Sequence, residues 1–132
     1  MDELWTFVGQ RGNKHWLWLA LCRRTRQVVA YALGARDAAT ARVLWQRLPT
    51  GYAFCCAHTD TWPAYAAALP AWQHTPRQRA GPRNHVERFN ATLRARLGRL
   101  VRKTLSFSKC AQMLEICIRL FLHRYNLAIY PK

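Results

Sequence analysis

Apolar residues gather in short runs over the first third of the chain, a pattern that is typical of β-strands. The runs lie at residues 4–8, 15–22 and 28–33. Turn-forming sequence separates them, because residues 9–14 include two glycines and an asparagine and residues 23–27 are polar and basic. Three strands joined by short turns predict an antiparallel meander.

The middle of the chain mixes helix and strand signals. Asp37 precedes an alanine-rich segment that ends before Pro49, which predicts a helix capped by the aspartate. Residues 52–57 form an uninterrupted apolar run, which we interpret as a central strand buried on both faces. A short helix that opens at Pro63 is expected next, followed by a short edge strand at residues 72–75.

The last third of the chain has the periodicity of helices. Between residues 84 and 101, apolar side chains recur at spacings of three and four, which predicts a long amphipathic helix. A final helix is expected to start at Ser106 or Ser108 and to reach about Tyr125. The order of elements predicts one α/β domain over residues 1–132. Its mixed sheet combines a three-strand antiparallel meander with parallel strands and is flanked by helices.

The charge of the chain points to its partner. Its 132 residues include 21 Lys and Arg against 6 Asp and Glu, for a formal net charge of +15. Such an excess disfavours the compact state through self-repulsion, and a polyanionic partner is the usual reason to retain it. Nucleic acid is the first candidate, since Lys and Arg replace counterions on phosphates. An anionic membrane surface is the second, but the basic residues are not confined to one amphipathic stretch. No apolar run is long enough to span a bilayer.

The five cysteines carry no recognisable ligand spacing. No two of them form a C-x-x-C pair, and their number is odd. We therefore predict buried free thiols in a reducing compartment rather than a zinc site or disulfides. The acidic start of the chain also predicts no secretory leader.

So few carboxylates stand in this basic chain that their positions are informative. Asp2 precedes the first strand, Asp60 follows the fourth, and Glu87 lies in the first turns of the long helix. If the first and fourth strands are neighbours, Asp2 and Asp60 face each other and the helix brings Glu87 across the sheet edge. Three hard oxygen donors suit Mg²⁺ or Mn²⁺, and a pair of such ions can promote attack at a phosphodiester. Arg88 and Arg94 follow Glu87, and Arg94 shares its helix face, where a guanidinium can grip a phosphate.

Each of these acids also has a structural interpretation. Asp2 can be a solvated terminal acid, Asp60 a cap on the short helix, and Glu87 a charge that compensates the helix dipole. The hypothesis of a metal site therefore rests on their joint placement. No chemistry is assigned to the other three acids, which are Glu3, Asp37 and Glu115.

Four ordered segments resemble InsB-like transposases of the insertion-sequence-one family. MDELWTFVG is similar to the segment around that family's first catalytic Asp, TDTWPAY to the segment around the second, and VERFN to the Glu segment. They lie here at residues 1–9, 59–65 and 86–90, and LSFSK at 105–109 also looks like a stretch of the family. Arg94 matches the basic residue two helical turns after the Glu.

The resemblance implies a ribonuclease-H-like catalytic domain of DDE type. Asp2, Asp60 and Glu87 would be its catalytic and metal-binding residues, with Mg²⁺ or Mn²⁺ as cofactor. The activity implied is cleavage of DNA at transposon ends and transfer of the freed 3′ hydroxyl to target DNA. The expected protein is a bacterial, cytoplasmic, nucleoid-associated homo-oligomer with no membrane partner. The residues expected to contact DNA are Arg88, Arg94, Lys103 and Lys109.

Full-length members of that family carry an upstream zinc-finger and helix-turn-helix region. Only Met1 precedes Asp2 here, so we expect this DNA-recognition region to be absent from the chain or supplied by a protein from an upstream reading frame. Two alternatives to an active transposase stay open. One is a truncated, non-catalytic, basic DNA-binding remnant, and the other is a host nuclease of the same fold.

Overall fold

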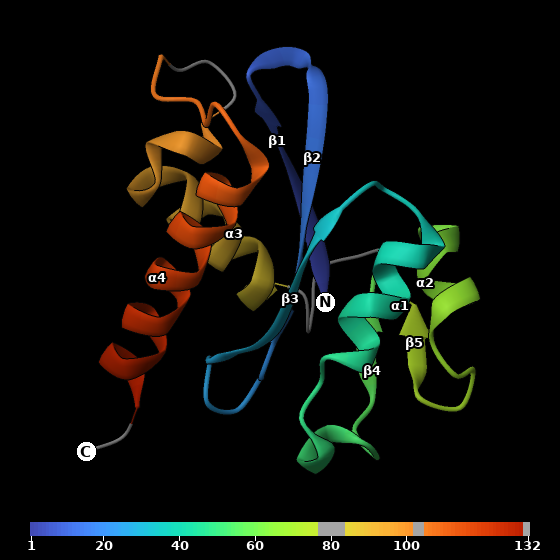
Figure 1. Cartoon of the computed structure of the whole chain (residues 1–132). Helices are drawn as coiled ribbons and strands as arrows, with labels where there is room; N and C mark the ends of the chain where they lie inside the picture. Colours follow the sequence, from blue (N-terminus) through green and yellow to red (C-terminus); the bar gives the residue numbers. More distant parts are fainter. Residues whose placement is uncertain (77–83, 102–104, 131–132) are drawn as a thin grey trace.

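The chain folds around a central β-sheet with helices on both of its faces (Figure 1). The computed structural model describes residues 1–76, 84–101 and 105–130. Within these ranges the elements are mixed α and β, as their order along the sequence predicts. Lys103, one of the expected DNA contacts, lies outside the described residues.

The central sheet is the predicted antiparallel meander. It contains β1 (Asp2–Val8), β2 (Gln10–Leu21) and β3 (Val28–Gly34), hydrogen-bonded in that order. The register places Asp2 opposite Leu19 and Trp18 opposite Ala32. Asp2 is therefore the first residue of a paired strand, not a residue that precedes it.

The turn between β1 and β2 is tighter than the sequence predicts. Gly9 alone reverses the chain, with a φ of 73° that disfavours residues with a side chain. Val8 and Gln10 already pair across it, so residues 10–14, predicted as turn, continue β2. The Asn13 amide donates a hydrogen bond to the Val8 carbonyl at 3.1 Å and closes the hairpin end.

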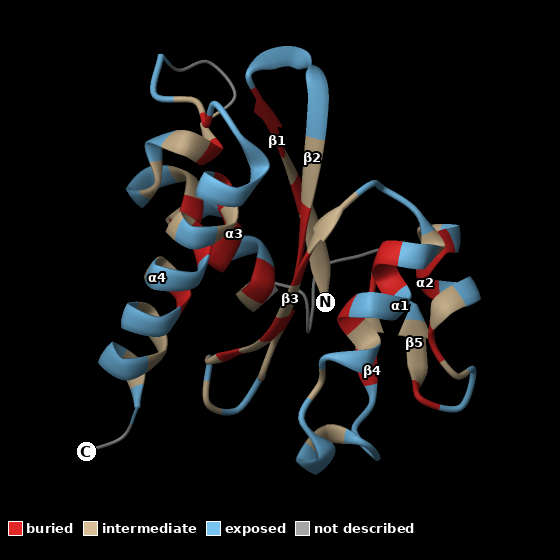
Figure 2. Ribbon diagram, in the orientation of Figure 1, coloured by how far each residue is buried: buried red, intermediate tan, exposed pale blue. Residues whose placement is uncertain are grey.

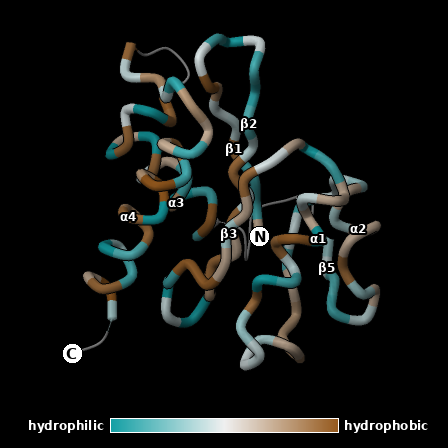
Figure 3. Tube along the Cα trace, in the orientation of Figure 1, coloured by the Kyte–Doolittle hydropathy of each residue, from teal (hydrophilic) through white to brown (hydrophobic). Residues whose placement is uncertain are grey.

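Each face of the sheet has its own hydrophobic core. Side chains alternate along β2, so Leu17 and Leu19 pack against α3 (Asn84–Arg96) and α4 (Ala111–Ile129). Trp18, on the opposite face, is fully buried together with Leu44 of α1 (Ala38–Gln46) and Tyr65 of α2 (Pro63–Ala68). Buried segments in Figure 2 accordingly lie where helices face the sheet. In Figure 3 the hydrophobic colour follows the central strands, whereas the β1–β2 hairpin end is hydrophilic.

The strands do not form the single mixed sheet that the sequence predicts. β4 (Ala57–Thr59) and β5 (His74–Pro76) pair in parallel as a separate two-stranded sheet, and β5 confirms the predicted edge strand. The start of β1 still lies beside β4, because the Met1 nitrogen donates to the His58 carbonyl at 2.6 Å. β4 is three residues long, and in the described part of the chain its ladder partner is β5.

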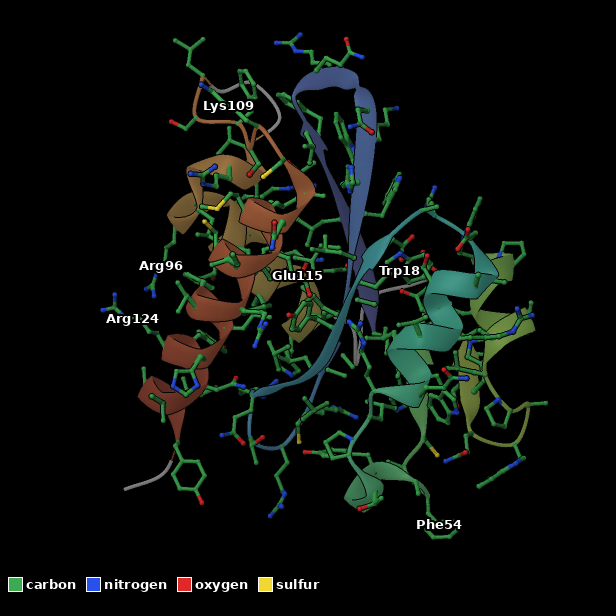
Figure 4. All side chains as sticks on the ribbon, viewed as in Figure 1. Trp18, Phe54, Arg96, Lys109, Glu115 and Arg124 are labelled. Atoms are coloured by element: carbon green, nitrogen blue, oxygen red, sulfur yellow. The ribbon has the colours of Figure 1, made fainter. Side chains whose placement is uncertain are left out.

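The predicted central strand at residues 52–57 is wrong. Thr50–Tyr52 form a single 3₁₀ turn, and the apolar residues that follow are exposed up to Cys56, with Phe54 87% exposed. Figure 4 shows Phe54 pointing away from the molecule. An apolar run does not by itself reveal whether its side chains find a core. Here the Gln73 side-chain amide binds the Ala53 carbonyl at 2.5 Å and holds the loop outside the sheet.

Helix boundaries follow local hydrogen bonds. Asp37 caps α1 as predicted, since its Oδ1 accepts the Thr40 N–H and hydroxyl, each at 2.8 Å. α3 ends at Arg96 and gives way to a 3₁₀ turn, short of the predicted residue 101. α4 starts at Ala111 rather than after Ser106 or Ser108. The buried Ser108 cannot join that helix because its carbonyl accepts the Gly9 N–H at 2.8 Å.

The cysteines are free, as predicted, but none of them is buried. Two are half-buried and three are exposed, because the apolar runs that contain them lie largely in loops and on helix surfaces. The half-buried pair is Cys22 and Cys117, and the exposed ones are Cys55, Cys56 and Cys110. In the described part of the chain, no helix combines the length and apolar character needed to cross a membrane.

Asn126 of α4 binds the edge strand β3 through two hydrogen bonds to one residue. Its Oδ1 accepts the Val28 N–H at 2.9 Å, and its Nδ2 donates to the Val28 carbonyl at 2.8 Å. We expect Asn126→Ala to lower the free energy of unfolding by about 1–2 kcal/mol, because both backbone groups lose a partner. Urea unfolding followed by tryptophan fluorescence measures this. The control Gln112→Ala, at an exposed site of the same helix, should change it by less than about 0.5 kcal/mol.

Candidate metal and nucleic-acid site

Three carboxylates meet where β1 begins and β4 ends. Asp2, Glu3 and Asp60 each offer an oxygen that lies within 4.8 Å of the other two. Asp2 and Glu3 open β1, and Asp60 follows the last residue of β4. The Met1–His58 hydrogen bond holds these two strands together at this point. The convergence of Asp2 and Asp60 agrees with the expectation that these two acids face each other.

The Asp2 carboxyl has a raised pKa. Burial raises the pKa of its carboxyl from 3.8 to about 6, helped by the nearby charges of Glu3 and Asp60. The Asn90 amide, on α3, donates to Asp2 Oδ2 at 2.8 Å. The other amide atom of that side chain, Asn90 Oδ1, is buried and has no hydrogen-bond partner among the described residues. An unpaired buried oxygen beside clustered carboxylates fits a hard divalent cation, for which all these atoms are suitable ligands.

Glu3 is held differently, by an ion pair and a buried tyrosine. Its side chain is only 2% exposed, and its Oε1 accepts two hydrogen bonds from Arg36, at 2.9 and 3.1 Å. Its Oε2 accepts the Tyr65 hydroxyl at 2.8 Å. The Arg36 guanidinium in turn lies over the rings of Trp16 and Trp62, 4.7 and 4.1 Å from their centroids. Both oxygens of Glu3 are therefore engaged within the protein.

Glu3 and Asn90 are site residues that the sequence alone did not predict. Residues 2 and 3 alternate across β1, so Asp2 faces α3 while Glu3 faces α2. The sequence signals for Asn90 were its place at the end of the VERFN segment and its position three residues after Glu87, on the same helix face. Nothing in the sequence links Glu3 to Arg36 or to Tyr65, because these contacts depend on how the elements pack.

Asp60 has both a structural contact and a place in the carboxylate group. Its Oδ1 accepts the Trp62 N–H at 2.9 Å, which stabilises the turn that leads into α2. The carboxylate nevertheless remains within reach of Asp2 and Glu3. The capping interpretation and the metal interpretation of Asp60 therefore do not exclude each other.

Glu87 does not belong to the carboxylate group in this structure. It is exposed on α3, one helical turn before Asn90, which is the residue of this helix that reaches Asp2. That separation corresponds to about 4.5 Å along the helix axis. Arg94 is half-buried two turns after Glu87 on the same face. The structure thus brings Asp2 and Asp60 together and places Glu87 nearby on the adjoining helix face.

The other predicted DNA contacts lie away from the carboxylates. Arg88 is exposed and lines a shallow groove with Arg26 and Tyr125. Lys109 is exposed just before α4. Figure 4 shows Arg96 and Arg124 projecting outward from the α3–α4 side of the molecule. Arg36, which pairs with Glu3, is therefore a basic side chain within the carboxylate group, whereas Arg88 and Lys109 are not among its contacts.

Comparison with known proteins gives a consistent result. The family model described as IS1 transposase matches residues 1–128. The chain is 36% identical to the insertion element iso-IS1n protein InsB of Shigella dysenteriae over 125 residues, covering 95% of this chain and 93% of that protein. It is 39% identical to the IS1 protein InsB of Shigella flexneri over 113 residues, covering 86% and 84%. For the IS1 4 protein InsB of Escherichia coli K12, the identity is 38%, covering 86% and 66%. No solved structure matches the chain.

The raised pKa of Asp2 makes a prediction for stability against pH. The folded state holds this proton more tightly than the unfolded state, so its contribution is present below about pH 4 and is lost as pH rises through about 6. Without divalent metal, Asp2→Asn should therefore unfold with a free energy up to ~3 kcal/mol higher than the parent at about pH 8, and nearly equal at about pH 4. Urea unfolding in EDTA at the two pH values measures the difference.

Asp37 provides a comparison of opposite sign. Hydrogen bonds from the Thr40 backbone and hydroxyl lower the pKa of its exposed carboxyl. Asp37→Ala should therefore destabilise the protein at about pH 8 and progressively less as pH falls below about 4.

The Asp2 prediction has a contradicting outcome. If Asp2→Asn is less stable than the parent at about pH 8, the folded state does not raise the pKa of the Asp2 carboxyl.

Proposed function

The chain belongs to the IS1 transposase family, and on that basis we propose that it is the catalytic domain of a DDE-type DNA transposase. The proposed reaction is metal-dependent cleavage of DNA strands at transposon ends, followed by strand transfer to target DNA. The observation that carries the proposal is the meeting of Asp2 and Asp60 at the end of β4. The net charge of +15 supports a polyanionic substrate. A ribonuclease-H-like fold is part of the proposal, supported by the meander followed by parallel strands.

Asp2 and Asp60 are the proposed carboxylate ligands of Mg²⁺ or Mn²⁺. Bound there, the ions would supply charge stabilisation at the scissile phosphate and a more nucleophilic hydroxyl. Asn90 positions Asp2 through the 2.8 Å hydrogen bond, and its Oδ1 is a further buried oxygen on the same side chain without a partner among the described residues. The raised pKa of Asp2 indicates that a cation is favourable here, because it would offset the desolvation of this carboxylate and the nearby charges of Glu3 and Asp60.

We assign the third carboxylate ligand to Glu87 and not to Glu3. Both oxygens of Glu3 already accept hydrogen bonds, and Arg36 neutralises its charge. A metal at Glu3 would have to compete with this ion pair. Glu87 is exposed on α3, one helical turn before Asn90, the residue through which this helix contacts Asp2. Arg94, on the same helix face, would hold a phosphate oxygen of the bound strand.

One observation favours a second candidate function. Glu87 lies outside the carboxylate group in this structure, and an incomplete ligand set would leave a basic protein that binds DNA without cutting it. The non-catalytic remnant therefore stays the alternative. Metal-dependent cleavage separates the two functions, whereas DNA binding is common to both.

Strand cleavage of a plasmid in Mg²⁺ or Mn²⁺ tests the proposal and the choice of the third ligand together. Loss of a ligand removes several kcal/mol of charge stabilisation, so Asp60→Ala and Glu87→Gln should each slow cleavage at least ~10²-fold. DNA binding, measured by fluorescence anisotropy in EDTA, should stay within about twofold of the parent. The control is Glu115→Gln, on α4, where the carboxylate accepts a hydrogen bond from Tyr31 of β3. This variant should cleave DNA at the rate of the parent.

Glu3→Gln discriminates between the two glutamates. It should lower stability by disturbing the Arg36 and Tyr65 contacts but retain cleavage at a temperature where the variant is folded. Cleavage that survives Glu87→Gln and disappears in folded Glu3→Gln would move the third ligand to β1. A parent protein that binds DNA but never cuts it in either metal would favour the remnant.

Metal binding also has a readout that does not depend on activity. Mn²⁺ should raise the melting temperature of the parent, because it binds the folded state only. The increase should be lost in Asp60→Ala and preserved in Glu115→Gln. It should also shrink as pH falls through about 6, since a ligand carboxylate must be deprotonated.

A further inference from the structure

A cavity of about 540 Å³ lies beside the carboxylate group and is not used by the proposed reaction. It is bounded by the end of β2, the 50–56 loop, β4 and the start of α3. Residues of β3 and of the end of α1 also line it, and its interior is mostly apolar, with side chains that include Ala20, Val29, Leu48, Ala57 and Val86. Its volume falls within the range of about 300–1,000 Å³ that is typical of sites for small organic ligands.

The cavity and the carboxylates share one wall. Met1 and His58 line the cavity, and the hydrogen bond between them is the contact that places Asp2 beside Asp60. None of the three clustered carboxylates is among the residues that line it. A ligand in the cavity would therefore sit next to a phosphodiester held at Asp2 and Asp60 without displacing a ligand of the metal.

The polar part of the lining is basic. Arg23 and Arg24, in the exposed β2–β3 turn, stand at one side, and His85 stands at another. Tyr52 and Trp45 add aromatic surface, on which a flat ring can stack. An apolar, partly aromatic interior beside two guanidinium groups matches a ligand that joins a planar ring to a phosphate.

We propose that this cavity binds one unpaired nucleotide of the DNA strand that the carboxylate site cuts. The base enters the apolar interior, and the phosphate is held by Arg23 and Arg24. This inference rests on the proposed function, because only a strand placed at Asp2 and Asp60 would run past the cavity. A base-paired nucleotide does not satisfy the site, since its base is stacked inside the duplex and has to be displaced to enter a pocket.

Two glycines provide a matched pair of variants. Gly51 lines the cavity and is exposed, and a Cβ added there meets nothing within 4 Å, so Gly51→Trp places an indole at the edge of the cavity without straining the fold. Gly12, in β2 and away from the cavity, has equally open surroundings, so Gly12→Trp is its control. Neither glycine has the positive φ that forbids a side chain.

The experiment compares a duplex bearing a short unpaired 3′ tail with a blunt duplex of equal length, by fluorescence anisotropy in EDTA. Stacking of one base is worth about 1–3 kcal/mol, so the parent should bind the tailed duplex roughly tenfold more tightly. Gly51→Trp should bind the two duplexes equally, whereas Gly12→Trp should keep the tenfold preference. A preference that survives Gly51→Trp, or a parent that shows none, overturns the proposal.

A charge-matched pair tests the phosphate contact. Arg23→Glu/Arg24→Glu and Arg119→Glu/Arg124→Glu change the net charge equally, and both pairs are exposed. Non-specific affinity for DNA should fall by the same factor in the two double variants. Only the first pair should lose the preference for the tailed duplex. Equal preferences in both double variants would show that these arginines act through general charge alone.

Native cysteines locate the bound strand directly. Cys22, Cys55 and Cys56 line the cavity, and Cys110 lies outside it. Burial opposes ionisation of Cys22, but hydrogen bonds from Thr25, Tyr52 and the Arg24 backbone outweigh it and lower its pKa to about 7. Its thiol should therefore react readily with iodoacetamide.

The tailed duplex should slow alkylation of the cavity cysteines at least threefold more than the blunt duplex does. The alkylation rate of Cys110 should be the same with either duplex. Equal protection by both duplexes counts against the proposal. Failure of metal-dependent cleavage with the tail preference intact would reject the catalytic role and leave the nucleotide site standing. Cleavage without any tail preference would reject the nucleotide site alone.

Discussion

The gathering of three half-buried carboxylates, with the desolvation and the mutual repulsion that it causes, is the constraint on which the rest of this structure depends. Asp2, Glu3 and Asp60 lie within 4.8 Å of one another in a chain that has only 6 acidic residues. The fold compensates Glu3 and Asp2 to different extents. Arg36 neutralises Glu3 and is itself held between two tryptophan rings, whereas Asp2 retains a raised pKa of about 6. The unbalanced part of the group is therefore the part that a divalent cation would stabilise.

The two cores of the molecule meet at this point. β1 sends Asp2 toward α3 and Glu3 toward α2, so one dipeptide connects the helix layers on opposite faces of the sheet. The contact between Met1 and His58 then brings the end of β4 alongside. The same contact forms the wall shared with the apolar cavity. A metal site and a proposed nucleotide site thus depend on one small region of packing.

The sequence predicted the features that are set by local chemistry. The meander follows from apolar runs between turns, and the cap on α1 follows from Asp37 placed before an alanine-rich segment. Residues 52–57 were misread because most of these apolar residues lie exposed in a turn and loop, and only Ala57 belongs to a strand. The placement of Asp2 beside Asp60 was accessible from their positions at strand ends. The engagement of Glu3 by Arg36 and Tyr65 was not, because it depends on the packing of elements far apart in sequence.

The central claim is that Asp2 and Asp60 bind a divalent cation together with Glu87. A crystal structure with Mn²⁺, collected at a wavelength where manganese scatters anomalously, tests this most directly. The account predicts an anomalous peak coordinated by Asp2 and Asp60, with the Glu87 carboxylate brought to the metal and Glu3 still paired with Arg36. A peak bound by Glu3 in place of Glu87, or no peak at this position in a metal-saturated crystal, would contradict it.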